Sequence, residues 1–295
     1  MEQLRMYFSM LVVVTILLVV GWGLGIFDQE IVSPLSRSLS SPSDTSSYSV
    51  SNGESDAGIV FADFPRKLNE SGVIDVKQYT LLSPLTEAER ALFEKNSADI
   101  QIHIENNDQF TLMLLWGLGL AQENAYLGEL TTMQQQEQLE KLASTGGWTI
   151  SKGEATSHFS RHNILALSDN QQRRVANIAA TIYRPCCNNH ARFADCNHGM
   201  AMLGVLSLGA SQGLSDDQLY TLAARFNRAW FLNQYAQIGQ YIQATQNKTL
   251  ADIDPKILVG KEFSSATGFT QNVVRPLAAL QAPKKIQSEG SGCSL

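Results

Sequence analysis

The residues best suited to chemistry lie close together, within residues 186–202. This segment holds three of the four cysteines, two of the five histidines and two methionines. Thiolate, imidazole and thioether groups bind soft and borderline metal ions. Such a cluster indicates a metal site, a thiol redox site or a disulfide staple. The candidate metal ligands are Cys186, Cys187, His190, Cys196, His198 and Met200.

The spacing of the cysteines allows them to meet. Cys196 comes just before an expected helix, where unpaired backbone amides favour a thiolate over a thiol. Cys186 and Cys187 follow a proline that ends the preceding helix. A helix–loop–helix hairpin would bring them back towards Cys196. Because an extended backbone points adjacent side chains apart, only one of the pair is expected to reach Cys196 unless the turn is tight.

The ligand types favour copper slightly over zinc. Mixed thiolate, imidazole and thioether ligands suit copper, whereas thiolate and imidazole alone suit zinc. Met200 and Met202 lie about 200° apart around a helix, so at most one can face a single ion, and methionine more often fills a core. An iron–sulfur cluster would need four thiolates, and the C-x-x-C-H motif of covalent haem is missing from the sequence.

Two other interpretations remain open. In a thiol–disulfide redox protein, Cys196 would be the nucleophile and Cys186 or Cys187 the resolving thiol. In a non-catalytic interaction module, a disulfide from Cys186 or Cys187 to Cys196 would staple two helices, closing a loop of about ten residues that is worth ~2–3 kcal/mol. The sequence contains no Ser-His-Asp, P-loop or dinucleotide-binding motif. It therefore does not decide whether the chain is an enzyme, and it identifies no protein partner.

A second histidine pair is a weaker candidate. His158 and His162 have the i, i+4 spacing that would present two imidazoles to one metal ion on a helix. They lie outside a clear helical pattern, and the glutamate of an H-E-x-x-H motif is missing. The pattern therefore favours no metal site here.

The N-terminal segment, residues 1–27, predicts a membrane anchor. Phe8–Phe27 contain no charged residue and, at ~1.5 Å per residue, would span a hydrocarbon core of ~30 Å. No small-residue cleavage site of the kind that ends a signal peptide follows. Arg5 precedes the segment, whereas Asp28 and Glu30 follow it. Since positive flanks stay inside, we expect a single-pass protein with a cytoplasmic N-terminus and an extracytoplasmic folded domain.

The remaining chain divides by composition. Residues 28–57 are rich in serine and predict a flexible linker, and residues 284–295, which include Cys293, predict a disordered tail. Residues 58–283 are long enough for a folded domain with its own core. The net charge of −6 argues against a nucleic-acid partner.

The folded part is expected to be mainly α-helical with minor short strands. Helical spacing of apolar residues and N-terminal capping patterns predict most of the elements, and one short stretch alternates as a strand does. Gly199, Ala201 and Gly204 would let a neighbouring backbone approach the helix that contains them. The expected helices cover residues 86–95, 109–122, 134–143, 169–183, 198–213 and 215–246, and the expected strand covers residues 100–104.

Two segments resemble a known signature. Arg-Pro-Cys-Cys-Asn-Asn at 184–189 and Asp-Cys-Asn-His-Gly-Met-Ala-Met-Leu-Gly at 195–204 are similar to a pattern found in a family of uncharacterised membrane-anchored prokaryotic proteins. The resemblance extends over about residues 65–270. It implies that these segments belong to one domain, and it brings no established activity and no catalytic residues.

Overall fold

A computed structural model describes residues 55–95 and 97–281 of the chain. The expected membrane anchor, nearly all of the expected linker and the expected disordered tail lie outside the described residues. In the described part, no helix combines the length and the apolar character needed to cross a membrane. The described residues belong to one compact unit.

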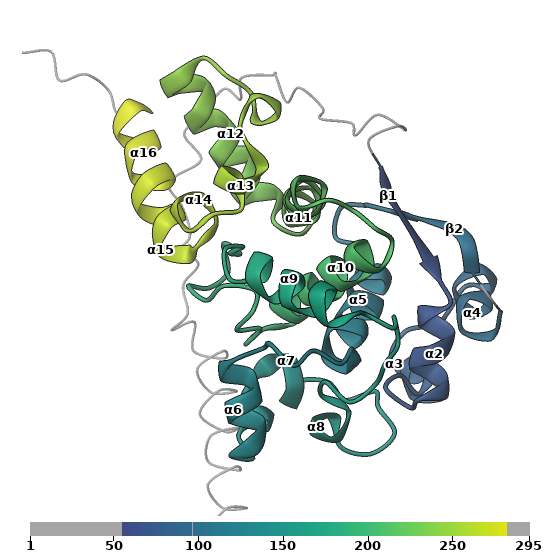
Figure 1. The fold of residues 1–295 in the computed structure, drawn as a ribbon. Coiled ribbons are helices and arrows are strands. Elements are labelled where there is room, and N and C mark those ends of the chain that lie inside the picture. Colours follow the sequence, from purple (N-terminus) through teal and green to yellow (C-terminus); the bar gives the residue numbers. More distant parts are fainter. Residues whose placement is uncertain (1–54, 96, 282–295) are drawn as a thin grey trace, which may run out of the picture. The chain divides into compact units, whose positions relative to one another are not determined.

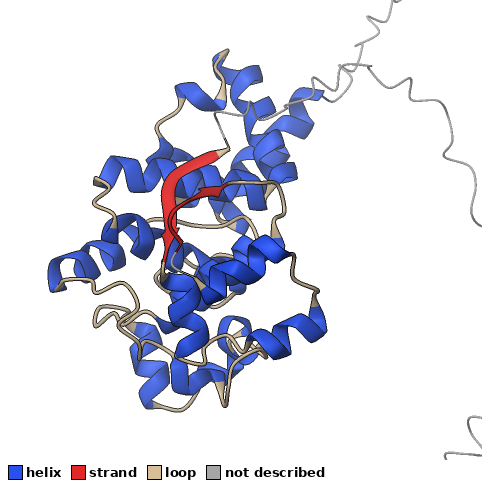
Figure 2. Ribbon diagram, turned by 90° about the vertical axis from the view of Figure 1, so that its right-hand side faces the viewer, coloured by secondary structure: helices blue, strands red, loops and turns tan. Residues whose placement is uncertain are grey.

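The described chain is mainly helical with a small two-stranded sheet, as the sequence predicts (Figures 1 and 2). The longer helices are α2 (Phe64–Glu70), α3 (Val76–Leu82), α4 (Glu87–Glu94), α5 (Gln109–Ala121), α6 (Glu129–Gln135), α9 (Asp169–Ala179), α10 (Asn197–Ser211), α11 (Asp216–Trp230), α12 (Leu232–Gln246) and α16 (Arg275–Gln281). Shorter turns of helix are α7 (Ala143–Gly146), α8 (Ala155–His158), α13 (Pro255–Leu258), α14 (Lys261–Ser264) and α15 (Ala266–Phe269), with 3₁₀ turns at Leu139–Lys141 and Leu250–Asp252 and a π-helical turn at Thr270–Val274.

Helices α5 and α10 form the centre of the fold (Figure 1). Nearly every residue of both is buried, and α10 also packs against α7, α9 and α11. Their backbones approach closely through two glycines. A Cβ atom on Gly119 would lie 1.8 Å from the carbonyl oxygen of Met200, and one on Gly204 would lie 2.1 Å from that of Leu115. The expectation that Gly204 admits a neighbouring backbone is therefore confirmed.

Capping residues explain where several helices begin. Thr86, Ser168 and Ser215 each form a capping box with the third residue of the helix that follows. Asp108 accepts hydrogen bonds from two backbone amides of α5. Each cap satisfies amides that would otherwise lack a partner at the helix start, which stabilises the helix by about 1 kcal/mol.

The two strands lie at one side of the helices. Strand β1 (Asp56–Ala62) pairs antiparallel with β2 (Ser97–His103), and the register shifts twice along the pair. His103 is exposed, as the alternation of this segment predicts. The first two residues of strand β1, Asp56 and Ala57, lie within the range expected for the linker.

Three helices are shorter than their sequence patterns predict. Only residues 134–135 of the helix expected at 134–143 belong to α6, because Glu137 adopts a left-handed φ of 53° and a 3₁₀ turn follows at Leu139–Lys141. Helix α9 ends at Ala179, and the chain then turns towards Tyr183, whose backbone pairs with that of His190. The long helix expected at 215–246 is interrupted at Phe231, with φ −127° and ψ 50°. Neighbouring residues point about 100° apart on a regular helix. The interruption therefore allows Trp230 and Phe231 to contact the same side chain, the ring of His198.

Candidate metal centre

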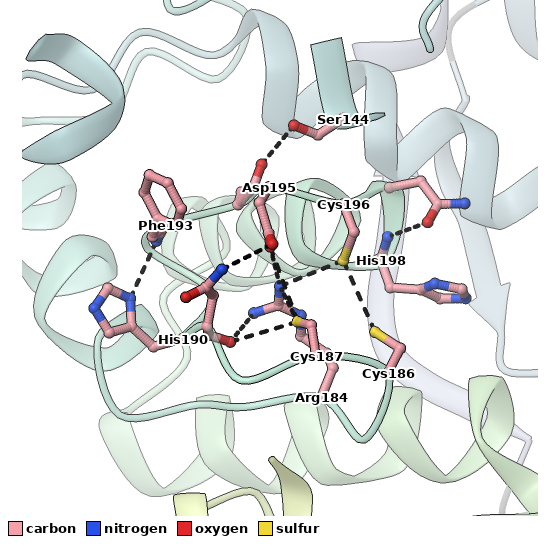
Figure 3. Close-up of polar contacts among 12 residues, drawn as sticks. Ser144, Arg184, Cys186, Cys187, His190, Phe193, Asp195, Cys196 and His198 are labelled. Carbon is pink, nitrogen blue, oxygen red and sulfur yellow. Dashed lines mark hydrogen bonds and ion pairs between the residues drawn. The ribbon is translucent and has the colours of Figure 1, made fainter. Parts of the chain in front are cut away.

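The three clustered cysteines come together where the loop after α9 meets the start of α10 (Figure 3). Their sulfur atoms all lie within 4.8 Å of one another, and the Sγ atoms of Cys186 and Cys196 are 3.9 Å apart. A tight turn makes this possible, since the amide of Cys187 donates to the carbonyl of Arg184 at 3.2 Å. Both adjacent cysteines therefore reach Cys196, so of the two alternatives that the sequence left open, the structure has the tight turn.

Neighbouring elements hold the cysteine loop in place. The amide of Ala266, at the start of α15, donates to the carbonyl of Cys187 at 2.9 Å. The side chain of Asn227, on α11, donates to the carbonyl of Tyr183 at 2.8 Å. On the other side, the hydroxyl of Ser144 donates to the carbonyl of Ala194 at 2.5 Å. These contacts fix the chain on both sides of the cluster.

Cys196 is the N-cap residue of α10, as the sequence predicts. Its side chain makes no capping hydrogen bond to the helix. The helix is 15 residues long, so its N-terminus carries an appreciable partial positive charge. This charge favours the thiolate form of Cys196.

A buried arginine completes the cluster. The side chain of Arg184 is fully buried, and its Nη2 lies 3.3 Å from the sulfur of Cys187 and 3.4 Å from that of Cys196. The same nitrogen forms an ion pair with Asp195 at 3.2 Å, and Nη1 donates to the carbonyl of Asn189 at 2.8 Å. The sequence analysis did not identify Arg184 as a site residue. Its position two residues before the cysteine pair was the available signal.

The thiols of the cluster differ in acidity. Hydrogen bonds with Cys186 and Cys187 lower the pKa of Cys196 well below that of a free thiol, and the charge of Arg184 adds to this effect. The pKa of Cys186 is raised, because its hydrogen bonds to the other two cysteines, and to a lesser degree the partial desolvation of its sulfur, favour the protonated thiol. Cys196 is therefore the first thiol of the cluster to lose its proton as the pH rises.

The other candidate ligands lie apart from the three sulfurs. Neither His190 nor His198 belongs to the group of ligand atoms within 4.8 Å of one another. The Nδ1 atom of His190 accepts a hydrogen bond from the amide of Phe193 at 3.1 Å. The ring of His198 lies against Trp230 and Phe231, with centroids 5.6 and 4.8 Å away. Burial lowers the pKa of both histidines, which keeps them neutral.

Both methionines of the segment are core residues. Met200 and Met202 are fully buried in the hydrophobic core around α10. This agrees with the usual packing role of methionine. The group of His, Cys, Asp and Glu ligand atoms that come together in the described residues consists of the three cysteine sulfurs.

The two residues of the second histidine pair, His158 and His162, interact with each other. The ring nitrogens of His158 and His162 lie 3.0 Å apart, and the other nitrogen of His158 donates to the carbonyl of Lys152 at 2.9 Å. Helix α8 ends at His158, so the two residues do not share a helix. No third His, Cys, Asp or Glu ligand joins them among the described residues.

The sulfur geometry suits a thiolate-bound ion. A zinc–sulfur bond of about 2.3 Å places two sulfurs of a tetrahedral site about 3.8 Å apart, and a planar three-sulfur site places them about 4.0 Å apart. The observed 3.9 Å between Cys186 and Cys196 lies between these values. The three cysteines are free thiols in the structure, so the disulfide staple gains no support from it.

Comparisons with known proteins identify neither a family nor a function for the chain. No protein-family model matches the chain, and no curated protein or solved structure matches it either. The resemblance to membrane-anchored prokaryotic proteins therefore stays a prediction, and function has to be argued from the site.

Proposed function

We propose that the chain is a membrane-tethered, extracytoplasmic protein that binds one copper or zinc ion through Cys186, Cys187 and Cys196. The observation that carries the proposal is the convergence of three free thiols within 4.8 Å. Thiolates are the protein ligands that select copper(I) and zinc. The tether rests on the sequence of residues 1–27 alone.

The surroundings of the thiols support metal binding. Metal ligands have to be deprotonated, and the pKa of Cys196 is already lowered. Cys186 is exposed, so an ion can reach the sulfurs from solvent. Arg184 and the N-terminus of α10 offset part of the negative charge that three thiolates would bring together.

Metal analysis of the purified full-length chain tests the proposal. Under reducing, metal-replete conditions we expect about one copper or zinc ion per chain, because thiolate sites bind these ions tightly. Serine substitutions at Cys186, Cys187 and Cys196 should each lower the metal content. Cys293→Ser is the matched control, since it removes the remaining cysteine of the chain. Less than ~0.2 ion per wild-type chain would refute metal binding.

The membrane tether needs its own measurement. Deleting residues 1–27 should move the protein from the membrane fraction to the soluble fraction without changing its metal content, because the cluster lies in the described domain. A truncated chain that still sediments with membranes would contradict the tether.

A thiol–disulfide redox function is the second candidate, favoured by the lowered pKa of Cys196. The Cys196 thiolate would attack a substrate disulfide and release one substrate thiolate. Cys186 would then lose its proton, attack Cys196 and release the second thiolate, leaving a Cys186–Cys196 disulfide and a reduced substrate. The two sulfurs would have to move from 3.9 Å to about 2.05 Å apart.

Incubation with oxidised glutathione tests the thiol–disulfide redox function separately from metal binding. The reduced, metal-free chain is incubated with it and the peptides are analysed by mass spectrometry. A Cys186–Cys196 disulfide, formed with release of two reduced glutathione molecules, would support the redox function. Stable mixed disulfides without a protein disulfide would argue against it.

A further inference from the structure

A permanent positive charge borders the cysteine cluster. Arg184 is fully buried, and an arginine stays protonated at all physiological pH values. Its Nη2 lies within 3.4 Å of the sulfurs of Cys187 and Cys196 (Figure 3). An ion bound by these sulfurs would have the guanidinium about 5 Å away, since metal–sulfur bonds are about 2.3 Å long.

The fold makes room for this guanidinium. A Cβ atom on Gly199 would lie 2.5 Å from Nη2 of Arg184, so only glycine allows the side chain to lie against the first turn of α10. The helix N-terminus there also carries partial positive charge. Burying a cation at such a place is unfavourable unless anions surround it, and Asp195 and the Cys196 sulfur, whose lowered pKa favours the thiolate, are the anionic groups that contact it.

Arg184 contacts the sulfur atoms but cannot supply a fourth ligand to an ion bound by them. A guanidinium has no acceptor atom and cannot bind a metal. The oxygens of Asp195 accept hydrogen bonds from Arg184 and Asn189, at 3.2 and 2.8 Å. Among the described residues, no fourth His, Cys, Asp or Glu atom lies within 4.8 Å of all three sulfurs. Structural zinc sites almost always have four protein ligands, whereas soft sulfur ligands suit copper(I).

We propose that Arg184 sets the charge of the ion that this site accepts, favouring monovalent copper over divalent zinc. The proposal rests on the metal-binding function proposed above and narrows it to one ion. A fixed positive charge repels a divalent ion twice as strongly as a monovalent one at the same place. At ~5 Å and an effective dielectric constant of ~20, the extra unit of charge changes relative affinity by roughly 100-fold.

Two substitutions of opposite sign test this in the full-length chain. Arg184→Met removes the positive charge at similar side-chain length, and Asp195→Asn removes the negative charge beside it. Affinities for Cu(I) and Zn(II) are measured separately, under anaerobic reducing conditions, by competition with chromogenic chelators. We expect the ratio of Cu(I) to Zn(II) affinity to fall ~10- to 100-fold in Arg184→Met and to rise at least ~3-fold in Asp195→Asn.

Two further variants complete the experiment. Arg184→Lys keeps the charge and should keep the ratio within ~3-fold of wild type. Arg173→Met is the matched control, because Arg173 is largely exposed and pairs with Asp169 on its own helix. If Arg184→Met fails to fold, as a melt by circular dichroism would show, Asp195→Asn and Arg184→Lys decide the question.

The outcomes separate the two proposals. If the wild-type chain binds neither ion, the metal-binding function fails and this inference fails with it. If the chain binds metal but Arg184→Met and Asp195→Asn leave the affinity ratio unchanged, or change it in the same direction, the inference is overturned while metal binding stands.

Discussion

The close packing of α5 on α10 makes Gly204→Ala a sharp test of the fold. An added Cβ atom would lie 2.1 Å from the carbonyl oxygen of Leu115 and 3.1 Å from the amide nitrogen of Gly119. Carbon and oxygen atoms in ordinary close contact are about 3.3 Å apart. The two helices would therefore have to separate locally by about 1.2 Å, and because backbone atoms are involved, no side chain can rotate to relieve the clash.

The expected loss of stability follows from two opposing effects. Overpacking a buried contact costs ~1–3 kcal/mol, and a backbone clash belongs at the upper end of that range. Replacing glycine by alanine inside a helix returns up to about 1 kcal/mol. We therefore expect Gly204→Ala to lower the free energy of unfolding by about 2 kcal/mol.

Gly209→Ala supplies the matched control on the same helix. Its Cβ atom would lie 2.7 Å from a terminal methyl carbon of Leu219, at the end of a flexible side chain that can turn away. Its packing cost should be roughly offset by the gain in helix propensity of ~1 kcal/mol. Urea denaturation of the metal-free chain, followed by circular dichroism, compares the two variants. If Gly204→Ala unfolds at the same urea concentration as Gly209→Ala, or at a higher one, the close helix contact is refuted.

Three further predictions concern the site. Gly199→Ala should lower the ratio of Cu(I) to Zn(II) affinity at least ~3-fold, because its Cβ atom would displace the guanidinium of Arg184; a chelator competition that shows an unchanged ratio would contradict this. Alkylation of Cys196 in the metal-free chain should stay fast below pH ~8.5, since its pKa is lowered and the thiolate is the reactive form; mass spectrometry across pH checks this, with Cys186 as the slower internal reference. His198→Ala should leave metal stoichiometry unchanged while lowering the melting temperature, because the ring packs on aromatic residues rather than joining the sulfur group.

Local signals in the sequence account for much of the fold. The capping box at Thr86 and the cap at Asp108 identify two helix starts, and Ser168 identifies a third, because a cap needs only residues three positions apart. The start of α10 lacks such a signal, because its N-cap residue is Cys196, which makes no side-chain capping hydrogen bond. The mainly helical class follows from helical spacing of apolar residues.

The remaining features depend on contacts between distant segments. The break at Phe231 has no glycine or proline to mark it, and its aromatic contact is with His198, more than thirty positions away. The burial of Arg184 depends on space beside Gly199 and on an ion pair with Asp195. Neither arrangement can be read from local periodicity, so the sequence did not show that His198 packs on aromatic residues and did not single out Arg184 as a residue of the site.

The same packing explains which part of the site can move. Cys196 begins a helix that is buried on nearly all sides and held by backbone contact at Gly204, so its sulfur has little freedom. Cys186 is exposed and lies in a turn. Closing the 3.9 Å gap between these sulfurs into a disulfide therefore requires motion of the Cys186 side, whereas the gap already suits an ion bound by both sulfurs. In the proposed metal-binding function, an ion bound to Cys196 would occupy its thiolate and so protect it from oxidation.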